Sequence, residues 1–316
     1  MPSEKMIDFL LAFLCEQSDK LKLSNAEWEA LLHFVTQQGV APLLYQRLTH
    51  TQLPPTKILD ALCEAYHHNA FKNAQYYQQL SEILKQLQAN GIEVIPLKGA
   101  YLAKTVYQPG ALRVIGDIDL LVKKADLEQT EKILLEMGYG PTERPSLKTQ
   151  CATSHHLDAF IKKGAFPIEI HWTLFSPLLP FEIRVDILWE QARSFTIGDV
   201  KILSLSPEDL LFHLCVHAAY SNRFVGMRFL CDIHSTIRYY EIDWDLLFSR
   251  ARQWKAEKAV YLALYTAWDW VGTLVPEKVL ERFKPSDFNL ELVVKIKEIS
   301  HIDIVNNWRA HEKFFA

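Results

Sequence analysis

The sequence has no excess of positive charge and no Cys-x-x-Cys pair, and each absence excludes a class of protein. Lysine and arginine number 34 against 38 aspartates and glutamates, a net charge of −4, so no overall basic field attracts nucleic acid. The five cysteines are dispersed. We therefore expect reduced core residues, as in a cytosolic protein, rather than a disulfide framework.

The sequence also lacks an apolar run long enough to cross a bilayer. The apolar stretch at residues 9–14 is too short for that. It follows Glu4, Lys5 and Asp8, and no small-residue cleavage site comes after it, so it does not have the layout of a signal peptide. We expect a cytoplasmic protein that does not associate with membranes. Its 316 residues, 49% of them apolar, suffice for two domains or for one core with large additions.

The first 90 residues have the spacing of helices. Ser24 and Glu27 form a capping-box pattern at the start of a helix that ends at Gly39. A longer helix is predicted from about residue 56 to 88, because apolar residues recur there at helical intervals.

At residue 91 the pattern changes to a strand that passes through a glycine turn into a helix. Residues 92–97 predict the strand, Lys98 and Gly99 end it, and a helix is expected over residues 101–107. Such a turn presents backbone N–H groups and the helix dipole to an anion, and Lys98 adds positive charge. On this segment alone, a plain turn with a solvated lysine explains the pattern equally well.

Residues 116–122 predict a strand that carries two acids among apolar residues. Asp117 and Asp119 are two positions apart, so they point to the same side, about 7 Å from each other. Their repulsion and desolvation would be relieved by Mg²⁺ or Mn²⁺, which prefer oxygen ligands. The alternative is an edge strand whose polar face is wet, and for an isolated Asp-x-Asp this is the more frequent case.

A third acid follows on a later strand. Residues 155–161 and 166–172 predict two strands joined by a turn at residues 162–165. Glu169 and His171 share one face of the second strand, and Glu169 is an acid flanked by isoleucines, like the aspartates before it. Taken alone, a glutamate that faces solvent on a half-buried strand is the simpler explanation.

The remainder of the sequence is predicted to be helical. On a helix that starts at Ser206, His213 and His217 stand four residues apart, a spacing that would suit zinc. No third ligand of similar character lies near them in the sequence, so a hydrogen-bonded structural pair is the preferred interpretation. Arg228 and Asp232 have the same spacing and could pair with each other.

The order of these features is more informative than any of them alone. A strand, a glycine turn, a helix, an Asp-x-Asp strand and an acid on a later strand resemble the DNA polymerase β-like nucleotidyltransferase superfamily. Within it, the sequence is similar to an uncharacterised bacterial nucleotidyltransferase family with a Lys-Gly motif. The similarity is carried by Leu97-Lys98-Gly99, Tyr107, Arg113, Asp117-Ile118-Asp119-Leu120-Leu121-Val122, Gly138-Tyr139 and Glu169-Ile170-His171-Trp172. It is dense over residues 92–175 and looser over both flanks.

The resemblance implies an α+β fold in three parts. A polymerase β-like nucleotidyltransferase core, a small mixed sheet with helices, would occupy residues 91–175. A helical region would precede it at residues 1–90, and another would follow it at residues 176–316. These helical flanks would form the walls of the cleft and select the acceptor.

The resemblance also implies the roles of the acids. Asp117, Asp119 and Glu169 would hold two metal ions, Mg²⁺ or Mn²⁺, and carry out catalysis. One ion would bind the triphosphate of an NTP, expected to be ATP, and the other would activate the acceptor hydroxyl. His171, on the same face as Glu169, could position the acceptor, although packing is the simpler role for it.

The phosphates would be held by Lys98, Gly99 and Arg113. One position departs from the superfamily pattern, because its first motif usually reads Gly-Ser or Gly-Gly, whereas Ala100 follows Gly99 here. The missing hydroxyl removes one phosphate contact, which backbone N–H groups, Lys98 or Arg113 could supply instead.

The implied function is transfer of a nucleoside monophosphate from an NTP to a hydroxyl of a small-molecule or protein acceptor; nucleic acid is not expected as a partner. One alternative is a nucleotidyltransferase-like binding module that acts through a partner protein, as antitoxin-type members do. A third interpretation is a glycosyltransferase, whose Asp-x-Asp holds a metal under a nucleotide sugar. That fold normally has a βαβ half before the motif, where this sequence is helical.

Overall fold

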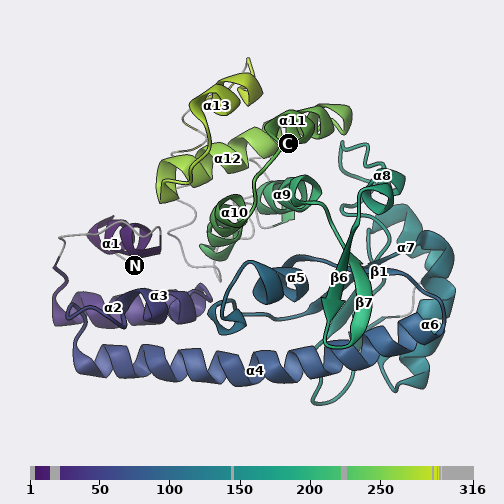
Figure 1. The fold of residues 1–316 in the computed structure, drawn as a ribbon, viewed down its shortest axis with the longest axis horizontal. Coiled ribbons are helices and arrows are strands. Elements are labelled where there is room, and N and C mark those ends of the chain that lie inside the picture. Colours follow the sequence, from purple (N-terminus) through teal and green to yellow (C-terminus); the bar gives the residue numbers. More distant parts are fainter. Residues whose placement is uncertain are drawn as a thin grey trace.

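One 34-residue helix, α4 (Thr56–Ala89), runs along one side of the molecule and joins the N-terminal helices to the sheet (Figure 1). The computed structural model describes residues 4–14, 22–143, 146–221 and 226–286, together with residues 288, 289, 291 and 293. Within these residues the chain folds as helices around a small mixed sheet, so the predicted α+β class is confirmed.

The N-terminal helices follow the sequence prediction closely. They are α1 (Glu4–Leu14), α2 (Asn25–Gln37) and α3 (Ala41–Leu48). The capping box at the start of α2 is confirmed, since Ser24 Oγ accepts a hydrogen bond from the Glu27 N–H at 3.3 Å and Glu27 Oε2 accepts one from the Ser24 N–H at 2.6 Å. The predicted helix over residues 56–88 is α4.

Neither a disulfide nor a membrane-spanning helix occurs among the described residues. Cys215 and Cys231 are buried free thiols, and Cys63 and Cys151 are half-buried ones; Cys15 lies outside the described residues. No described helix is both long and apolar enough to cross a membrane.

Five short strands form the central sheet in the order β1–β2–β5–β4–β3. Strand β2 is antiparallel to β1 and parallel to β5, while β4 is antiparallel to both β5 and β3. The strands are β1 (Val94–Pro96), β2 (Ile118–Val122), β3 (Gly140–Pro141), β4 (Phe160–Ile161) and β5 (Ile168–His171). The parallel register sets Asp119 beside Glu169 and Leu121 beside His171, so the predicted placement of Glu169 next to the aspartate strand is confirmed.

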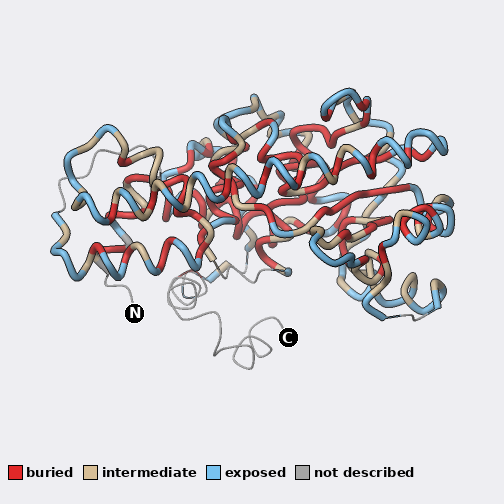
Figure 2. The backbone as a smooth tube through the Cα atoms, turned by 90° about the horizontal axis from the view of Figure 1, so that it is seen from below, coloured by how far each residue is buried: buried red, intermediate tan, exposed pale blue. Residues whose placement is uncertain are grey.

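Side-chain alternation along β2 divides its residues between two hydrophobic clusters. Ile118, Leu120 and Val122 pack with α6 (Leu127–Glu136) and with the C-terminal half of α4. Leu121 packs into the other cluster, which contains residues of α9 (Pro207–Val216) and α10 (Arg228–Tyr239). Asp119 is two residues before Leu121, so its carboxylate faces the side of α9 and α10. Figure 2 shows the buried segments running through the interior from the N-terminal helices to the sheet.

The chain after β5 is not entirely helical as predicted. It contains a β-hairpin that lies beside β1 and against α4, made of β6 (Arg193–Ile197) and β7 (Val200–Ser204). Gly198 and Asp199 between alternating residues are a turn signal that could have identified it. The helices are α8 (Val185–Glu190), α9 (Pro207–Val216), the π-helical turn η3 (His217–Ser221), α10 (Arg228–Tyr239), α11 (Trp244–Gln253), α12 (Glu257–Val271) and α13 (Glu277–Phe283).

The connections before β5 also contain short helices. These are α5 (Lys98–Thr105), η1 (Gly110–Leu112), η2 (Lys124–Asp126) and α7 (Leu147–Thr153). Helix α5 begins three residues earlier than the predicted start at residue 101, so the Lys-Gly pair lies inside the helix rather than in the turn before it.

Two buried asparagines of α4 hold the segment that leads into β2. The side-chain amides of Asn69 and Asn73 donate hydrogen bonds of 2.6–3.2 Å to backbone carbonyl oxygens within residues 110–113. One turn further along, the Tyr76 hydroxyl donates to the Asp117 carbonyl oxygen at 2.9 Å. Helix α4 therefore fixes the backbone that carries the aspartates.

We predict that Asn73→Ala lowers the free energy of unfolding by about 1–3 kcal/mol, because it removes the two hydrogen bonds that the buried amide donates to the carbonyl oxygens of Gly110 and Arg113. Urea denaturation measures this loss. The control is Gln75→Ala, at an exposed position of the same helix, which should change stability by no more than about 0.5 kcal/mol. Equal stabilities of the two variants would contradict the proposed support of the β2 segment by α4.

Candidate active site

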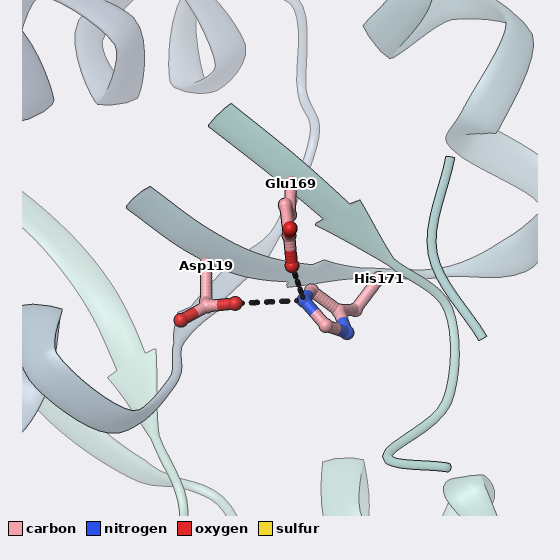
Figure 3. A group of neighbouring side chains, drawn as sticks. All are labelled: Asp119, Glu169 and His171. Atoms are coloured by element: carbon pink, nitrogen blue, oxygen red, sulfur yellow. Dashed lines mark hydrogen bonds and ion pairs between the residues drawn. The ribbon is translucent and has the colours of Figure 1, made fainter. Parts of the chain in front are cut away.

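Asp119 is the centre of a buried polar cluster on the face of the sheet towards α9 and α10. Its side chain is only 2% exposed. Its Oδ1 accepts a hydrogen bond from Lys98 Nζ at 2.9 Å and lies 3.0 Å from Nε2 of His171. The same imidazole nitrogen is 3.5 Å from Oε2 of Glu169 (Figure 3). A histidine 52 residues away in the sequence and a lysine from α5 thus meet at one carboxylate oxygen.

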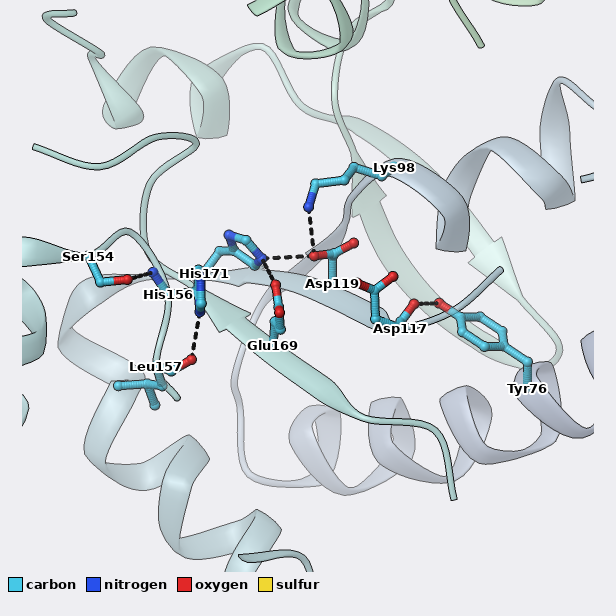
Figure 4. A network of polar contacts seen from close by, with 9 residues as sticks. All are labelled: Tyr76, Lys98, Asp117, Asp119, Ser154, His156, Leu157, Glu169 and His171. Atoms are coloured by element: carbon cyan, nitrogen blue, oxygen red, sulfur yellow. Dashed lines mark hydrogen bonds and ion pairs between the residues drawn. The ribbon is translucent and has the colours of Figure 1, made fainter. Parts of the chain in front are cut away.

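Asp117 lies next to this cluster but is not part of its closest group. The carboxylate and imidazole atoms that lie within 4.8 Å of one another belong to Asp119, Glu169 and His171. Asp117 immediately precedes β2 and lines the same pocket, with its side chain beside that of Asp119 (Figure 4). His171 therefore lies with two of the three predicted metal ligands, Asp119 and Glu169. From the sequence, packing was the simpler role for this histidine.

The two aspartates have opposite electrostatic environments. Burial by itself would raise the pKa of Asp119, but Lys98 and His171 outweigh it and hold that pKa well below its usual value. Burial and the neighbouring charge of Asp119 raise the pKa of Asp117. Burial favours the neutral amine of Lys98, yet Asp119 raises the lysine pKa above its usual value. One aspartate is therefore stabilised in its charged form and the other is not.

Lys98 reaches Asp119 from an unusual backbone conformation. It is the first residue of α5 and has a φ of 42°, a value that few residues other than glycine adopt. Its side chain is 16% exposed. The ion pair with Asp119 offsets the cost of this conformation, which for such a residue is about 1–3 kcal/mol.

Gly99 and Arg113 are in close contact, and Arg113 is already engaged. A Cβ on Gly99 would lie 2.5 Å from Arg113 Nη1, so only glycine permits this approach. Arg113 Nε and Nη2 donate to the two carboxylate oxygens of Asp232 at 2.8 and 2.7 Å, and the Tyr107 hydroxyl donates to the same group at 2.9 Å. Asp232 thus pairs with Arg113, and the predicted pair with Arg228 is wrong.

Histidines form a second polar group around His171. The imidazole rings of His155 and His156 lie 5.3 and 5.1 Å from that of His171. The His156 ring is held by a contact of 2.7 Å between Nδ1 and the Leu157 carbonyl oxygen. Burial lowers the pKa of His155 to about 3, so this residue is neutral at physiological pH.

His213 and His217 do not form the hydrogen-bonded pair that the sequence predicted. His213 is buried and His217 is half-buried, and loss of contact with water lowers the pKa of each well below its usual value. Neither ring nitrogen of His213 has a hydrogen-bond partner. Within the part of the chain that the structure describes, they also do not join a group of three potential metal ligands. The zinc interpretation therefore has no support here.

These residues surround a pocket of 410 Å³ between the sheet and the helices that follow it. One wall carries Lys98, Asp117, Asp119 and Glu169; the opposite wall is formed by the end of α9, η3 and the start of α10. The sequence analysis expected a helical flank to form a wall of the cleft, but helical periodicity alone did not show which residues of that flank line the pocket.

The donor set is compatible with a divalent cation. Two carboxylates and an imidazole whose ligand atoms lie within 4.8 Å of one another are close enough for one ion to contact all three. Oxygen ligands suit Mg²⁺ and Mn²⁺, and the imidazole favours Mn²⁺ over Mg²⁺. Nδ1 of His171 is buried without a hydrogen-bond partner among the described residues, so no hydrogen bond on that side fixes the imidazole.

No curated protein matches the chain. The fold is similar to the solution structure of the antibiotic-resistance factor ANT(2'')-Ia, with a TM-score of 0.41 and 12% identity over 60% of this chain and 94% of that one. It is similar to the same degree, TM-score 0.41, to an antigenic nucleotidyltransferase-like protein from Paracoccidioides brasiliensis, with 16% identity over 66% of this chain and 93% of that one.

A family model covers the pocket and both of its walls. It matches residues 24–272, well over half of the chain, and describes an uncharacterised nucleotidyltransferase. With the acids of β2 and β5 inside the matched range, the chain belongs to this family of uncharacterised nucleotidyltransferases.

Proposed function

We propose that this protein is a metal-dependent nucleotidyltransferase that moves a nucleoside monophosphate from an NTP, expected to be ATP, to a hydroxyl of a small-molecule or protein acceptor. The observation that supports the proposal is that Asp117, Asp119 and Glu169 line one pocket, with the His171 imidazole grouped with the carboxylates of Asp119 and Glu169. Family membership supports nucleotidyl transfer as the type of reaction. A cytoplasmic location and a protein partner remain predictions.

The reaction exchanges one phosphorus–oxygen bond for another. The acceptor hydroxyl oxygen forms a bond to the α-phosphorus, the bond from that phosphorus to the β-bridging oxygen breaks, and pyrophosphate leaves with the bonding electrons. Asp117, Asp119 and Glu169 would hold two divalent cations. The one held by the aspartates would offset the triphosphate charge, and the one that Glu169 helps to hold would lower the pKa of the hydroxyl. A hydrogen bond with His171 lowers the pKa of Glu169, so its carboxylate is ionised and available to receive the hydroxyl proton.

Lys98 has two successive partners in this proposal. Without substrate, its ammonium neutralises Asp119 at 2.9 Å. With a cation at Asp119, the ammonium would be available to contact a phosphate oxygen at the N-terminus of α5, where Gly99 would contribute its backbone N–H. Arg113 would contribute through Nη1, the guanidinium nitrogen that does not contact Asp232.

Incubation with NTPs labelled in the α-phosphate tests the function. The protein is combined with Mg²⁺ or Mn²⁺ and cell extract, and the labelled product is identified. Label from the α-phosphate but not from the γ-phosphate indicates transfer of the monophosphate. A binding module would bind NTP and label nothing, and a glycosyltransferase would consume a nucleotide sugar instead.

Substitution of each aspartate by asparagine should distinguish the roles of Asp117 and Asp119. Asp117→Asn and Asp119→Asn should both abolish the rise in melting temperature that NTP and Mg²⁺ cause, since each removes a ligand charge. Without ligand they should differ. The lowered pKa of Asp119 means that its ionised form stabilises the fold above the unfolded-state pKa, so its loss should cost about 1–3 kcal/mol at pH 7.5. The raised pKa of Asp117 means that its charge opposes folding, so its amide should be neutral or stabilising. A full ligand-induced shift in both variants would refute the metal assignment.

Lys98→Met should change two affinities in opposite directions. Triphosphate binding should weaken by about 1.5–3 kcal/mol, because a charged hydrogen bond is lost. Binding of Mn²⁺ alone should strengthen, because the ammonium no longer competes for Asp119. Calorimetry with NTP and electron paramagnetic resonance with Mn²⁺ measure the two constants. Lys104→Met, on the same helix, is the control, and an unchanged NTP affinity in Lys98→Met would show that Lys98 does not bind phosphate.

Glu169→Gln should keep NTP binding and lose transfer. The amide preserves the shape of the side chain but removes the charge that receives the proton, so labelling should fall by several orders of magnitude. Glu128→Gln, at an exposed position of α6, is the matched control. Near-normal labelling by Glu169→Gln would show that Glu169 has no part in the chemistry.

A further inference from the structure

The wall opposite the acids contains an arginine that the proposed chemistry does not use. Arg228 is the first residue of α10, and its exposed side chain lines the pocket. The other lysine and arginine on the pocket surface, Lys98 and Arg113, are bonded to Asp119 and Asp232. Among the residues that the structure describes, no carboxylate lies within ion-pair distance of Arg228.

The position of Arg228 is fixed by buried contacts from the N-terminal helices. The side-chain oxygen of Gln38, which is 8% exposed, accepts a hydrogen bond from the Met227 N–H at 2.9 Å. This bond attaches the start of α10 to the end of α2. A Cβ on Gly39 would lie 3.8 Å from Arg228 Nη1, so the guanidinium reaches the turn between α2 and α3. The backbone before Arg228 is therefore fixed by Gln38, and the guanidinium lies near the turn between α2 and α3.

Apart from Asp232, the described residues of this wall carry no negative charge. Leu214 and Phe229 are apolar, Ser221 is neutral, and burial lowers the pKa of His217, so that residue is neutral as well. The carboxylate of Asp232 is already bound by Arg113 and Tyr107. A polycationic acceptor would therefore find no free carboxylate on the described part of this wall, whereas an anion would find one free guanidinium.

We propose that Arg228 binds an anionic group of the substrates, a phosphate or a carboxylate, across the pocket from Asp117 and Asp119. The inference rests on the proposed function, since it assigns a residue to the same pocket. A guanidinium suits this role because its planar array of N–H donors can bind two oxygens of one anion at once. The anion has two possible sources: the polyphosphate of the NTP, or an acidic acceptor.

Calorimetry with two probes distinguishes these sources. The first probe is magnesium tripolyphosphate, which has the charge of the nucleotide tail without a base. The second is inorganic phosphate added to protein saturated with magnesium tripolyphosphate, which reports on the remaining anion site. Arg228→Gln should weaken one of the two about 10- to 100-fold. The affinity of Arg228→Lys for the same probe should lie between those of the wild type and Arg228→Gln, because lysine keeps the charge but loses the bidentate geometry.

The control is Arg193→Gln, which removes an exposed arginine from β6, outside the pocket, and should bind both probes as the wild type does. Melting temperatures confirm that each variant is folded. Weaker tripolyphosphate binding assigns Arg228 to the nucleotide, and weaker phosphate binding alone assigns it to an acidic acceptor. Unchanged binding of both probes overturns the assignment of Arg228 alone, whereas a wild-type protein that binds neither probe overturns the proposed function as well.

Discussion

The site depends on one buried carboxylate and on the two groups that neutralise it. Asp119 is removed from water, which would normally favour its protonated form, and it stays ionised because Lys98 and His171 converge on a single oxygen. The rest of the local structure supports this arrangement. Strand pairing brings His171 from β5, the left-handed backbone at Lys98 directs its ammonium inwards, and α4 holds the segment that leads to the aspartates.

Much of the local structure could be predicted because it depends on short-range patterns. The capping box at Ser24, the helix over residues 56–88 and the strand that carries Asp119 all follow from residue spacing, although β2 begins one residue after Asp117 rather than at residue 116. The pairing of β2 with β5 followed from the resemblance to a family, since spacing alone cannot show which strands become neighbours. The proposed roles of Asp117, Asp119, Glu169, Lys98, Gly99 and Arg113 are predictions that the experiments above address.

The features that the sequence did not reveal depend on tertiary contacts. Arg228 and Asp232 are spaced for a helical pair, but Arg113 binds both oxygens of Asp232 from a segment more than 100 residues away. His213 is buried without a hydrogen bond, which no spacing rule would anticipate. The hairpin over residues 193–204 was overlooked because the surrounding helical periodicity obscured its turn signal. Local sequence patterns predict helices and strands, whereas the ion-pair and hydrogen-bond partners of a side chain are set by how those helices and strands pack.

The length of α4 has a consequence for how the protein unfolds. Ile58 and Leu62 near its start belong to one hydrophobic cluster, and Leu80, Ile83 and Leu84 near its end belong to the other. Strand β2 is shared in the same way, through Leu121 on one face and Leu120 on the other. A domain boundary at residue 90 would divide the sequence after α4, but it would not separate these two hydrophobic clusters. Because neither cluster can lose its structure without exposing residues of the elements that it shares, heat or denaturant should melt both in one cooperative transition.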